Sequence, residues 1–416
     1  MVQTDVCVLG AGPGGVATSL QLAKLGISSI LVDKAVFPRD KICGDALSGK
    51  VVYAFNRIDK AIFHDFNAKK DIKADCWGVK FIYPNGIDIE IKMGKDLTVE
   101  ELPFHKPDGF ISKRIDFDNF LVNYVRKEDL IDFREGTHIT DIKRTDNGFI
   151  LKDKKGTTEI QAKLVISADG AQSKFAREHG NIQKEDKHYA GSVRAYYKNV
   201  KGCTAHNHIE LHYITEFFPG YLWIFPLPNG AANVGLGMRT DKLSKSKINL
   251  KKELLRLLDE HPRFKDRFDE AELDGKIKGF GLPLGSKKRK ISGDNYMLIG
   301  DAASLIDPLT GEGIGNAAIS GRFAALQAKE CLDANDFSAA FLKQYDKTVY
   351  NKLWKELQIS TQLQRAFQYP RLVNFTSKLV HKNKRFIEIL SAMFTDVDLR
   401  KKLRNPMFYV RMIFNR

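Results

Sequence analysis

TDVCVLGAGPGGVATSLQLAKLGISSILVD, residues 4–33, contains a strand pattern, a glycine-rich turn, a helix pattern and a second strand pattern in direct succession. The apolar run at residues 4–9 predicts the first strand, and a helical pattern continues through Leu25. The second apolar run ends at Asp33. This order predicts the βαβ unit that opens a Rossmann-like α/β domain.

The glycine turn has the spacing Gly10-x-Gly12-x-x-Gly15 directly after the first strand. Such glycines let the chain turn tightly, let a pyrophosphate approach the backbone, and seat it on a helix N-terminus that favours negative charge. Asp33 lies 23 residues beyond Gly10 and can accept hydrogen bonds from the ribose hydroxyls of an adenine dinucleotide. The other interpretation is an ordinary turn between strand and helix. We therefore predict a dinucleotide site, to which we also assign Pro13, Gly14 and Lys34.

A second glycine-rich segment follows a strand pattern about 290 residues later, with Gly300-Asp301 and then Pro308-x-x-Gly311-x-Gly313-Ile314. An aspartate at a strand end can hold a ribityl hydroxyl. Backbone N–H groups at the start of a helix near Gly313 would face the electron-rich edge of an isoalloxazine and stabilise negative charge on a reduced flavin. The alternative is a plain glycine-rich helix start.

Two further motifs lie between these segments, Arg114-x-x-Phe117-Asp118 and Ala168-Asp169-Gly170. The four motifs in this order resemble the FAD-dependent fold of para-hydroxybenzoate hydroxylase and its relatives, which include flavin monooxygenases, halogenases and geranylgeranyl reductases. The resemblance extends over about residues 4–330. It implies FAD as the cofactor, with Arg114, Asp169 and Gly170 in its site.

The segment FPRDKICG at residues 37–44 directly follows the second strand. It resembles the Arg-x-Lys-x-Cys-Gly segment of the geranylgeranyl reductase family, which the resemblance places beside the flavin. Arg39, Cys43 and Gly44 are then expected to contact the cofactor. Because Arg39 and Lys41 would favour a thiolate, Cys43 can be a reactive thiol. The alternative is a small packing residue.

The stretch FPGYLWIFPLPNGAANVGLG, residues 218–237, resembles the substrate-site signature of the same family. Alternation at period two puts Tyr221, Trp223 and Phe225 on one side of a sheet, and Pro226 ends the run. Gly235 and Gly237 leave a bare strip of backbone where a ligand or another chain can approach. We predict that these six residues bind substrate, the alternative being an ordinary buried hairpin.

The resemblance implies an FAD-dependent oxidoreductase that acts on CH–CH groups. It would saturate C=C double bonds of a polyprenyl group, as in lipid biosynthesis, by hydride transfer from reduced flavin N5 plus protonation. Tyr221 and Cys43 are the candidate proton donors, and NAD(P)H or ferredoxin is the expected electron donor. One alternative is a flavin-dependent monooxygenase or halogenase on the same fold. Another is a non-catalytic flavoprotein.

The motif positions predict a discontinuous FAD-binding domain with a β-rich, antiparallel substrate domain inserted into it. Helices are predicted at 115–127, in the charged segment 248–272, from about Gly313, and from 337 onward, with a Lys- and Gly-rich loop at 275–290. The predicted FAD-binding domain is residues 1–74, 111–185 and 290–335, the substrate domain is 75–110 and 186–289, and the C-terminal helical region is 336–416.

The chain has 416 residues, a net charge of +15 and five cysteines without CxxC or CxxH spacing, so no metal site is predicted. It contains neither an apolar run long enough to span a membrane nor a signal-peptide pattern, which predicts a cytoplasmic location. The absence of zinc-finger and RNP patterns argues against a nucleic-acid partner. We expect a monomer or a weak dimer.

The basic charge is concentrated at the C-terminus. Residues 371–416 hold eleven Lys or Arg against three acidic residues, mixed with apolar side chains such as Phe386 and Met393. One interpretation is peripheral contact with the anionic inner face of a membrane. The other is a solvated helical cap whose apolar side lies in the core.

Overall fold

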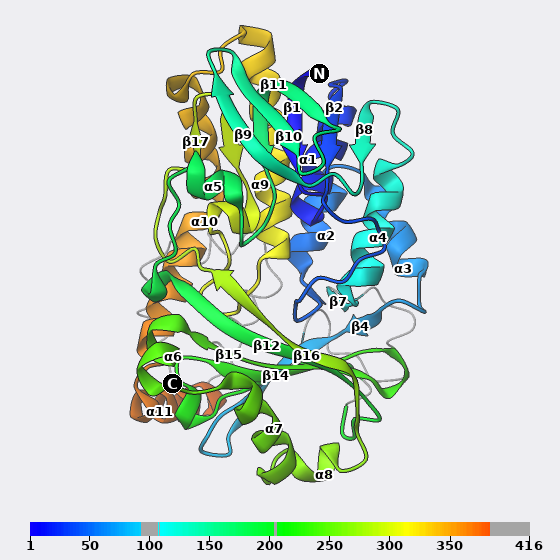
Figure 1. Cartoon of the computed structure of the whole chain (residues 1–416). Helices are drawn as coiled ribbons and strands as arrows, with labels where there is room; N and C mark the ends of the chain where they lie inside the picture. Colours follow the sequence, from blue (N-terminus) through cyan, green and yellow to red (C-terminus); the bar gives the residue numbers. More distant parts are fainter. Residues whose placement is uncertain (93–106, 108, 204–205, 383–416) are drawn as a thin grey trace.

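The computed structural model of the chain describes residues 1–92, 107, 109–203 and 206–382 (Figure 1). It begins with β1 (Val2–Leu9), α1 (Pro13–Lys24) and β2 (Ser29–Val32), which confirms the predicted βαβ opening. The last four residues of β1 and all of β2 are buried. Pro13 occupies the first turn of α1, where its missing N–H has no intrahelical partner to lose.

An eight-stranded sheet is built around β1. Its order is β17-β18-β11-β1-β2-β8, and β10 and β9 attach beside β11. The pairs of β1 with β2 and β11, β2 with β8, and β11 with β18 are parallel, whereas β9, β10 and β17 pair antiparallel. The further strands are β8 (Ile131–Arg134), β9 (Ile139–Thr145), β10 (Gly148–Asp153), β11 (Glu159–Ser167), β17 (Ser292–Gly293) and β18 (Tyr296–Leu298).

The parallel strands end at one edge of this sheet. Leu9 of β1 pairs with Val32 of β2 and with Ser167 of β11, and Ser167 pairs with Leu298 of β18. In open α/β sheets, ligands bind beyond the carboxyl ends of the strands. The predicted motifs follow directly at this edge, in residues 10–15, 33–44, 168–170 and 300–314.

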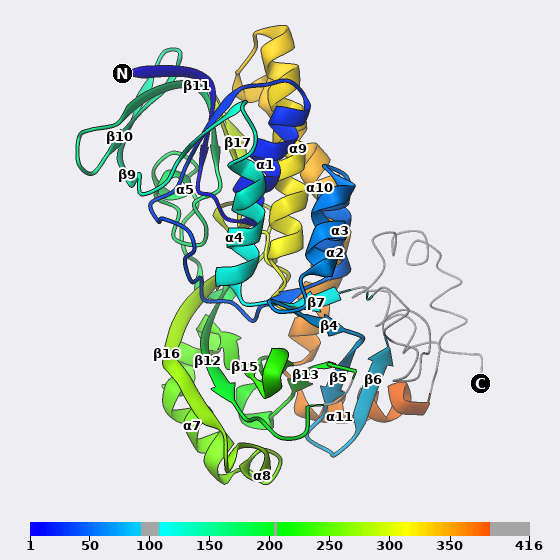
Figure 2. The same ribbon diagram turned by 90° about the vertical axis from the view of Figure 1, so that its right-hand side faces the viewer.

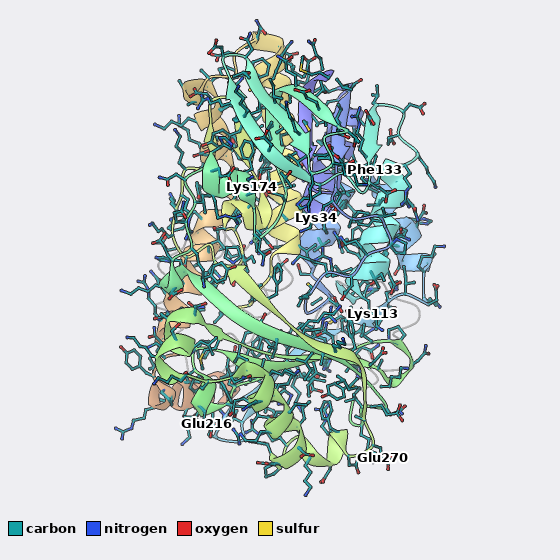
Figure 3. All side chains as sticks on the ribbon, viewed as in Figure 1. Lys34, Lys113, Phe133, Lys174, Glu216 and Glu270 are labelled. Carbon is teal, nitrogen blue, oxygen red and sulfur yellow. The ribbon has the colours of Figure 1, made fainter. Side chains whose placement is uncertain are left out.

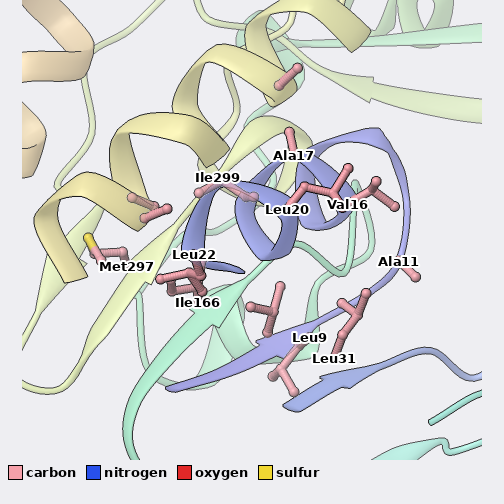
Figure 4. Close-up of a cluster of buried hydrophobic side chains, with 14 of the residues drawn as sticks. Leu9, Ala11, Val16, Ala17, Leu20, Leu22, Leu31, Ile166, Met297 and Ile299 are labelled. Carbon is pink, nitrogen blue, oxygen red and sulfur yellow. The ribbon is translucent and has the colours of Figure 1, made fainter. Parts of the chain in front are cut away.

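Helices α1 and α9 (Ile314–Ala334) pack together on one face of this sheet. Figure 4 shows part of the resulting core, in which Val16 and Leu20 of α1 approach Ile299 and other buried apolar side chains. The helices approach so closely that a Cβ at Gly321 would lie 2.5 Å from the carbonyl oxygen of Gly14. The start of α9 at Ile314 confirms the helix predicted near Gly313.

A seven-stranded sheet forms the lower part of the molecule in Figures 1 and 2. Its order is β16-β12-β15-β14-β13-β5-β6, antiparallel except for the parallel pair of β13 and β5. This sheet confirms the predicted antiparallel insertion. Its strands are β5 (Gly78–Ile82), β6 (Asp88–Lys92), β12 (Tyr189–Lys198), β13 (Ile209–His212), β14 (Tyr221–Pro226), β15 (Ala232–Arg239) and β16 (Glu272–Pro283).

The loop prediction for residues 275–290 is wrong over its first part, because β16 continues to Pro283 and pairs with β12. Lysines and glycines suggest a loop, but lysine is common on edge strands and glycine often marks a bulge, such as the register shift between β12 and β16. β16 is the edge strand of its sheet, and Lys276 and Lys278 are exposed. Position in the sheet therefore overrides the local composition.

The two faces of the seven-stranded sheet have different neighbours. Leu222 and Ile224 of β14 pack in a core that includes Leu254 and Leu257 of α7 (Leu250–Glu260). Trp223 and the other rings of β14 belong to a separate cluster on the opposite face. This alternation confirms that Tyr221, Trp223 and Phe225 share one side of the sheet.

The remaining elements complete the layers. A three-stranded sheet has the order β3-β7-β4, and α10 extends from beside the eight-stranded sheet toward the seven-stranded one (Figure 1). Helices α4, α7 and α10 confirm the predicted helical segments. The bounds are β3 (Ala46–Leu47), β4 (Ala74–Cys76), β7 (Gly109–Ile111), α2 (Gly49–Asn56), α3 (Lys60–Ala68), α4 (Arg114–Val125), α5 (Lys174–Glu178), α6 (Thr240–Ser246), α8 (Lys265–Phe268), α10 (Ala339–Ala366) and α11 (Pro370–Lys382).

Within the described residues, no helix combines the length and apolarity needed to cross a bilayer. Most of the basic C-terminal segment, residues 383–416, lies outside the described residues. The proposed membrane contact of this segment therefore stays a prediction, as do the predicted domain boundaries.

Candidate active site

A cavity of about 810 Å³ lies between the carboxyl edge of the eight-stranded sheet and the inner face of the seven-stranded sheet. This volume is within the range of small-molecule and cofactor sites. The predicted cofactor residues that line it are Gly10, Gly12, Pro13, Gly14, Asp33, Lys34, Arg39, Cys43, Gly44, Arg114, Asp169, Gly170, Gly300, Asp301, Gly311, Gly313 and Ile314. Two predicted cofactor residues, Gly15 and Pro308, are not in the lining.

Both exceptions have structural roles. A Cβ at Gly15 would lie 1.8 Å from the carbonyl oxygen of Gly10, so this glycine allows α1 to pack against the turn. The carbonyl of Pro308 accepts a hydrogen bond from the Gln364 side chain, which ties the 307–313 loop to α10.

The first glycine turn presents bare backbone to the cavity. Gly10 has φ +99°, and a Cβ there would lie 2.6 Å from the carbonyl oxygen of Ala168. At Gly12 the space is open, with only Arg39 Nη2 at 4.0 Å from an added Cβ. Gly12 also precedes the N-terminus of α1, whose unpaired N–H groups and dipole attract anions. This arrangement fits the pyrophosphate of FAD.

Asp33 lies at the end of β2. Its carboxylate accepts hydrogen bonds from the backbone N–H of Ala11, at 2.7 Å, and of Ala35, at 2.8 Å. These bonds hold the carboxylate at the cavity edge, where its free lone pairs can accept ribose hydroxyls. Lys34 and Lys174, both labelled in Figure 3, bring positive charge to the same cavity. Lys174 is a site residue that the sequence did not indicate.

The flavin side of the cavity is formed by Gly300 to Ile314. Gly300 and Asp301 belong to a short 3-10 helix after β18, and Gly313 precedes the first turn of α9. Since the first N–H groups of a helix lack intrahelical partners, this end of α9 can stabilise negative charge on a reduced isoalloxazine. The residues present therefore fit FAD at both of its ends.

A buried arginine, Arg114, and a half-buried one, Arg39, support the segment of Cys43. Arg114 donates two hydrogen bonds to Asp118, both at 2.7 Å, and Arg39 donates another to the same carboxylate. Burial alone would lower the pKa of Arg114. The charge and hydrogen bonds of Asp118 outweigh this effect and raise the pKa, and the neighbouring Cys43 also acts to raise it. The motif Arg-x-x-Phe-Asp is thus an ion pair one helical turn apart. It holds Arg114 beside Cys43 and anchors Arg39 to the same carboxylate.

The aromatic residues form the opposite wall. Tyr221, Trp223 and Phe225 line the cavity, and the ring of Trp223 lies 6.3 Å from each of the other two. Gly235 does not leave room for a ligand, because Trp223 already covers it: a Cβ at Gly235 would lie 2.1 Å from Trp223 Cζ2. This corrects the expectation of an open strip. Gly237 and Pro226 are also outside the cavity lining.

Of the two candidate proton donors, Tyr221 already uses its hydroxyl group in a hydrogen bond within the protein. Its hydroxyl donates a hydrogen bond of 2.5 Å to the carbonyl of Thr310, and burial raises its pKa. This bond ties the aromatic wall to the glycine-rich loop before α9. Cys43 lines the cavity with a half-buried side chain and keeps its candidate role.

The structure adds a buried network that the sequence did not reveal. Asp45 is fully buried, and its Oδ2 accepts hydrogen bonds from Tyr196, at 2.7 Å, and Asn233, at 2.8 Å. Burial raises the pKa of Asp45 to about 6, although these hydrogen bonds and the charges of Arg194 and Arg114 oppose the rise. The available signal was Asn233, a polar residue within an apolar strand.

Two more charged groups were not predicted as site residues. Lys41 lines the cavity with its Nζ 3.5 Å from the centre of the Phe280 ring, and burial lowers its pKa. Lys50, which is outside the cavity lining, binds the lining residue Glu356 and lies 3.6 Å from Glu312. Both pairings join segments far apart in the chain, so no local pattern indicated them.

Comparison with known proteins gives consistent results. The model of the FAD binding domain family matches residues 3–347. The digeranylgeranylglycerophospholipid reductase of Thermoplasma volcanium is 29% identical over 362 residues, covering 84% of this chain and 83% of the relative. The menaquinone reductase of Mycolicibacterium smegmatis is 31% identical over 333 residues, covering 78% and 76%. A solved geranylgeranyl bacteriochlorophyll reductase-like protein of Thermoplasma acidophilum superimposes with a TM-score of 0.80 at 23% identity, covering 97% of this chain and 99% of that chain.

Proposed function

The chain belongs to the FAD-binding domain family, as an oxidoreductase of the geranylgeranyl reductase group, and from this premise we propose that it reduces C=C double bonds of a polyprenyl group. The observation that carries the proposal is the cavity, which has flavin-binding motifs on one side and an aromatic wall on the other. A geranylgeranyl-type chain is apolar and extended, and such a wall suits it. The names of the Thermoplasma relatives support this class of substrate.

FAD, when bound and reduced, supplies the hydride for alkene reduction. An isolated alkene is a poor electrophile, so its placement must supply much of the rate. Trp223 and Phe225 are less than 10% exposed and present flat apolar surfaces that exclude water. The start of α9 favours negative charge at the flavin edge. The second hydrogen of the product is a proton, for which Cys43 is the candidate donor.

We also propose an external electron donor, NAD(P)H or a ferredoxin. Only one GxGxxG segment of the sequence lies between a strand and a helix, and FAD would occupy it. The net charge of +15 would attract an acidic donor protein or an anionic dinucleotide. We further propose that the basic C-terminal segment makes peripheral contact with an anionic membrane. We also propose that the protein is a monomer or a weak dimer.

The proposal is tested by the reoxidation of reduced flavin. The FAD-loaded protein is reduced anaerobically with dithionite and mixed in a stopped-flow instrument with a geranylgeranyl diphosphate or lipid. We expect the oxidised flavin spectrum to return without oxygen, and a fully saturated analogue, the matched control, to leave the flavin reduced. Reoxidation that requires oxygen and yields a hydroxylated or chlorinated product would instead support a monooxygenase or halogenase. Flavin inert to both would support a non-catalytic flavoprotein.

A further inference from the structure

Asn233 is a fully buried polar side chain between two apolar residues of β15. It pairs with Phe225 of β14 and Tyr196 of β12. Because side chains alternate along a strand, Asn233 shares the face of Gly235, which lies beneath the indole of Trp223. Asn233 thus lies next to the aromatic wall, on the same face of the sheet.

The hydrogen bonds of Asn233 connect two walls of the cavity. Its Oδ1 accepts from Trp223 Nε1 at 2.9 Å. Its Nδ2 donates to the carbonyl of Cys43 and to Oδ2 of Asp45, both at 2.8 Å. An indole N–H can only donate and a carbonyl can only accept, so the orientation of the amide is fixed. Each hydrogen-bonding group of the amide is used.

The 43–45 segment also packs directly on the aromatic wall. A Cβ at Gly44 would lie 3.0 Å from Phe225 and 3.7 Å from Trp223 Nε1. Asp45 has φ +70°, a conformation uncommon for a residue with a side chain. Surrounding contacts must hold such a backbone in place, and the bonds from Tyr196 and Asn233 do so.

We propose that Asn233 is a positioning residue, which fixes Trp223 relative to the 43–45 segment and so sets the separation of the two walls between which the prenyl chain and the flavin meet. This inference rests on the proposed function. It goes beyond it because Asn233 is outside the cavity lining and acts through Trp223 and Cys43. Loss of this link would misplace the substrate, and a misplacement of about 1 Å can cost about 100-fold in rate.

Asn233→Asp gives a sharp test, because it keeps the shape of the side chain and the bond from Trp223. It places a second carboxyl beside Asp45, and two carboxyls at this distance share one proton before both ionise. Burial already raises the pKa of Asp45 to about 6. The other charged or titratable groups that act on Asp45 are Arg194 and Tyr196 of β12 and Arg114 of α4. At low pH a shared proton restores the bond to Asp45, although not the bond to the Cys43 carbonyl, whereas at pH 8 the two charges repel.

The experiment uses FAD-loaded protein labelled with 5-fluorotryptophan. The chain has three tryptophans, and Trp223→Phe assigns the fluorine resonance of Trp223. Asn123→Asp is the matched control, since it adds the same charge at an exposed position of α4. In Asn233→Asp we expect kcat/KM for anaerobic prenyl reduction to fall about 100-fold at pH 8, with part of the loss regained near pH 5. The Trp223 resonance should move with the same pH dependence without substrate, and by more than any change that the titration of Asp45 causes in the wild type or the control.

An Asn233→Asp variant that matches Asn123→Asp in both readouts would overturn the inference. If Asn233→Asp does not fold, the Trp223→Phe variant tests the inference instead, because it removes the N–H group that donates to Asn233. It should lower kcat/KM for prenyl reduction without acquiring pH dependence, and wild-type kinetics in this variant would also overturn the inference. A wild-type protein that reduces no prenyl compound would contradict the proposed function, while the fluorine spectra would still decide the role of Asn233 in placing Trp223.

Discussion

Gly235 shows how a residue without a side chain shapes the cavity wall. The indole of Trp223 fills the space over its backbone, and an added Cβ would lie 2.1 Å from Trp223 Cζ2 and 2.4 Å from the carbonyl oxygen of Val193. Gly237, two residues later on the same face, has its nearest neighbour at 3.4 Å, which is ordinary contact. The packing of Trp223 therefore requires a glycine at position 235 but not at position 237, although both belong to the same Gly-x-Gly motif.

This difference predicts unequal effects of two alanine substitutions. Gly235→Ala should lower the free energy of unfolding by about 1–3 kcal/mol and displace the indole, because an overpacked site has to shift its neighbours. Gly237→Ala, the matched control, should change it by less than about 0.5 kcal/mol. Urea denaturation of both variants measures the effect. Equal stabilities of the two variants would contradict the position of Trp223.

The raised pKa of Asp45 makes the free energy of unfolding depend on pH. Its pKa is about 6 in the folded protein against an ordinary 3.8, so between these pH values the folded protein holds a proton that the unfolded chain has lost. The contribution of this group is therefore greatest at low pH and is lost as the pH rises through about 6. A shift of about two pKa units corresponds to about 3 kcal/mol.

Asp45→Asn keeps the shape of the side chain and removes the titration. We expect the free energy of unfolding of the wild type to fall by up to about 3 kcal/mol relative to this variant between pH 4 and pH 8. Equilibrium urea denaturation at both pH values makes the comparison. Parallel pH profiles of the two proteins would show that Asp45 does not hold its proton in the folded state.

The turn between β1 and α1 is the element that we propose holds the pyrophosphate of FAD. Two of its glycines can be separated experimentally. Gly15→Ala would bring Cβ to 1.8 Å from the Gly10 carbonyl, so we expect it to destabilise the protein even without FAD, by at least about 2 kcal/mol. Gly12→Ala meets nothing closer than 4.0 Å and should keep the stability of the FAD-free protein.

The methyl group of Gly12→Ala would, however, occupy the space that the pyrophosphate approaches, so its affinity for FAD should fall at least about tenfold, equivalent to about 1.4 kcal/mol. Thermal unfolding without FAD and flavin fluorescence titration measure the two effects. FAD affinity unchanged in Gly12→Ala would place the pyrophosphate elsewhere.

The same element shows why part of the fold could be predicted from the sequence. β1, α1 and β2 follow one another within 31 residues, and each is specified by its own apolar pattern and by Gly10 and Pro13. β16 was missed because its local composition contradicts its place at the edge of a sheet. Strand pairing of this kind is decided by distant residues, which no local pattern reveals.

At the scale of the whole molecule, the two sheets meet at the cavity. The motifs on the eight-stranded sheet could be assigned from sequence because each follows a strand whose carboxyl end lies at one edge. The link between Asn233 and Asp45 could not, since 188 residues separate them. The packing of Trp223 over Gly235 was also not predicted, because the spacing of glycines in a sequence does not show whether a ligand or a side chain fills the space over them.

We propose that both walls of this cavity serve one reaction, the reduction of a prenyl chain over FAD. Mass spectrometry of isoprenoids after anaerobic incubation with the dithionite-reduced, FAD-loaded protein tests it most directly. Geranylgeranyl groups carried on a diphosphate, a glycerolipid, a quinone and a pigment should be compared. We expect a gain of two hydrogens for each double bond reduced in at least one of these compounds, and no gain in any of them would contradict the proposed reaction.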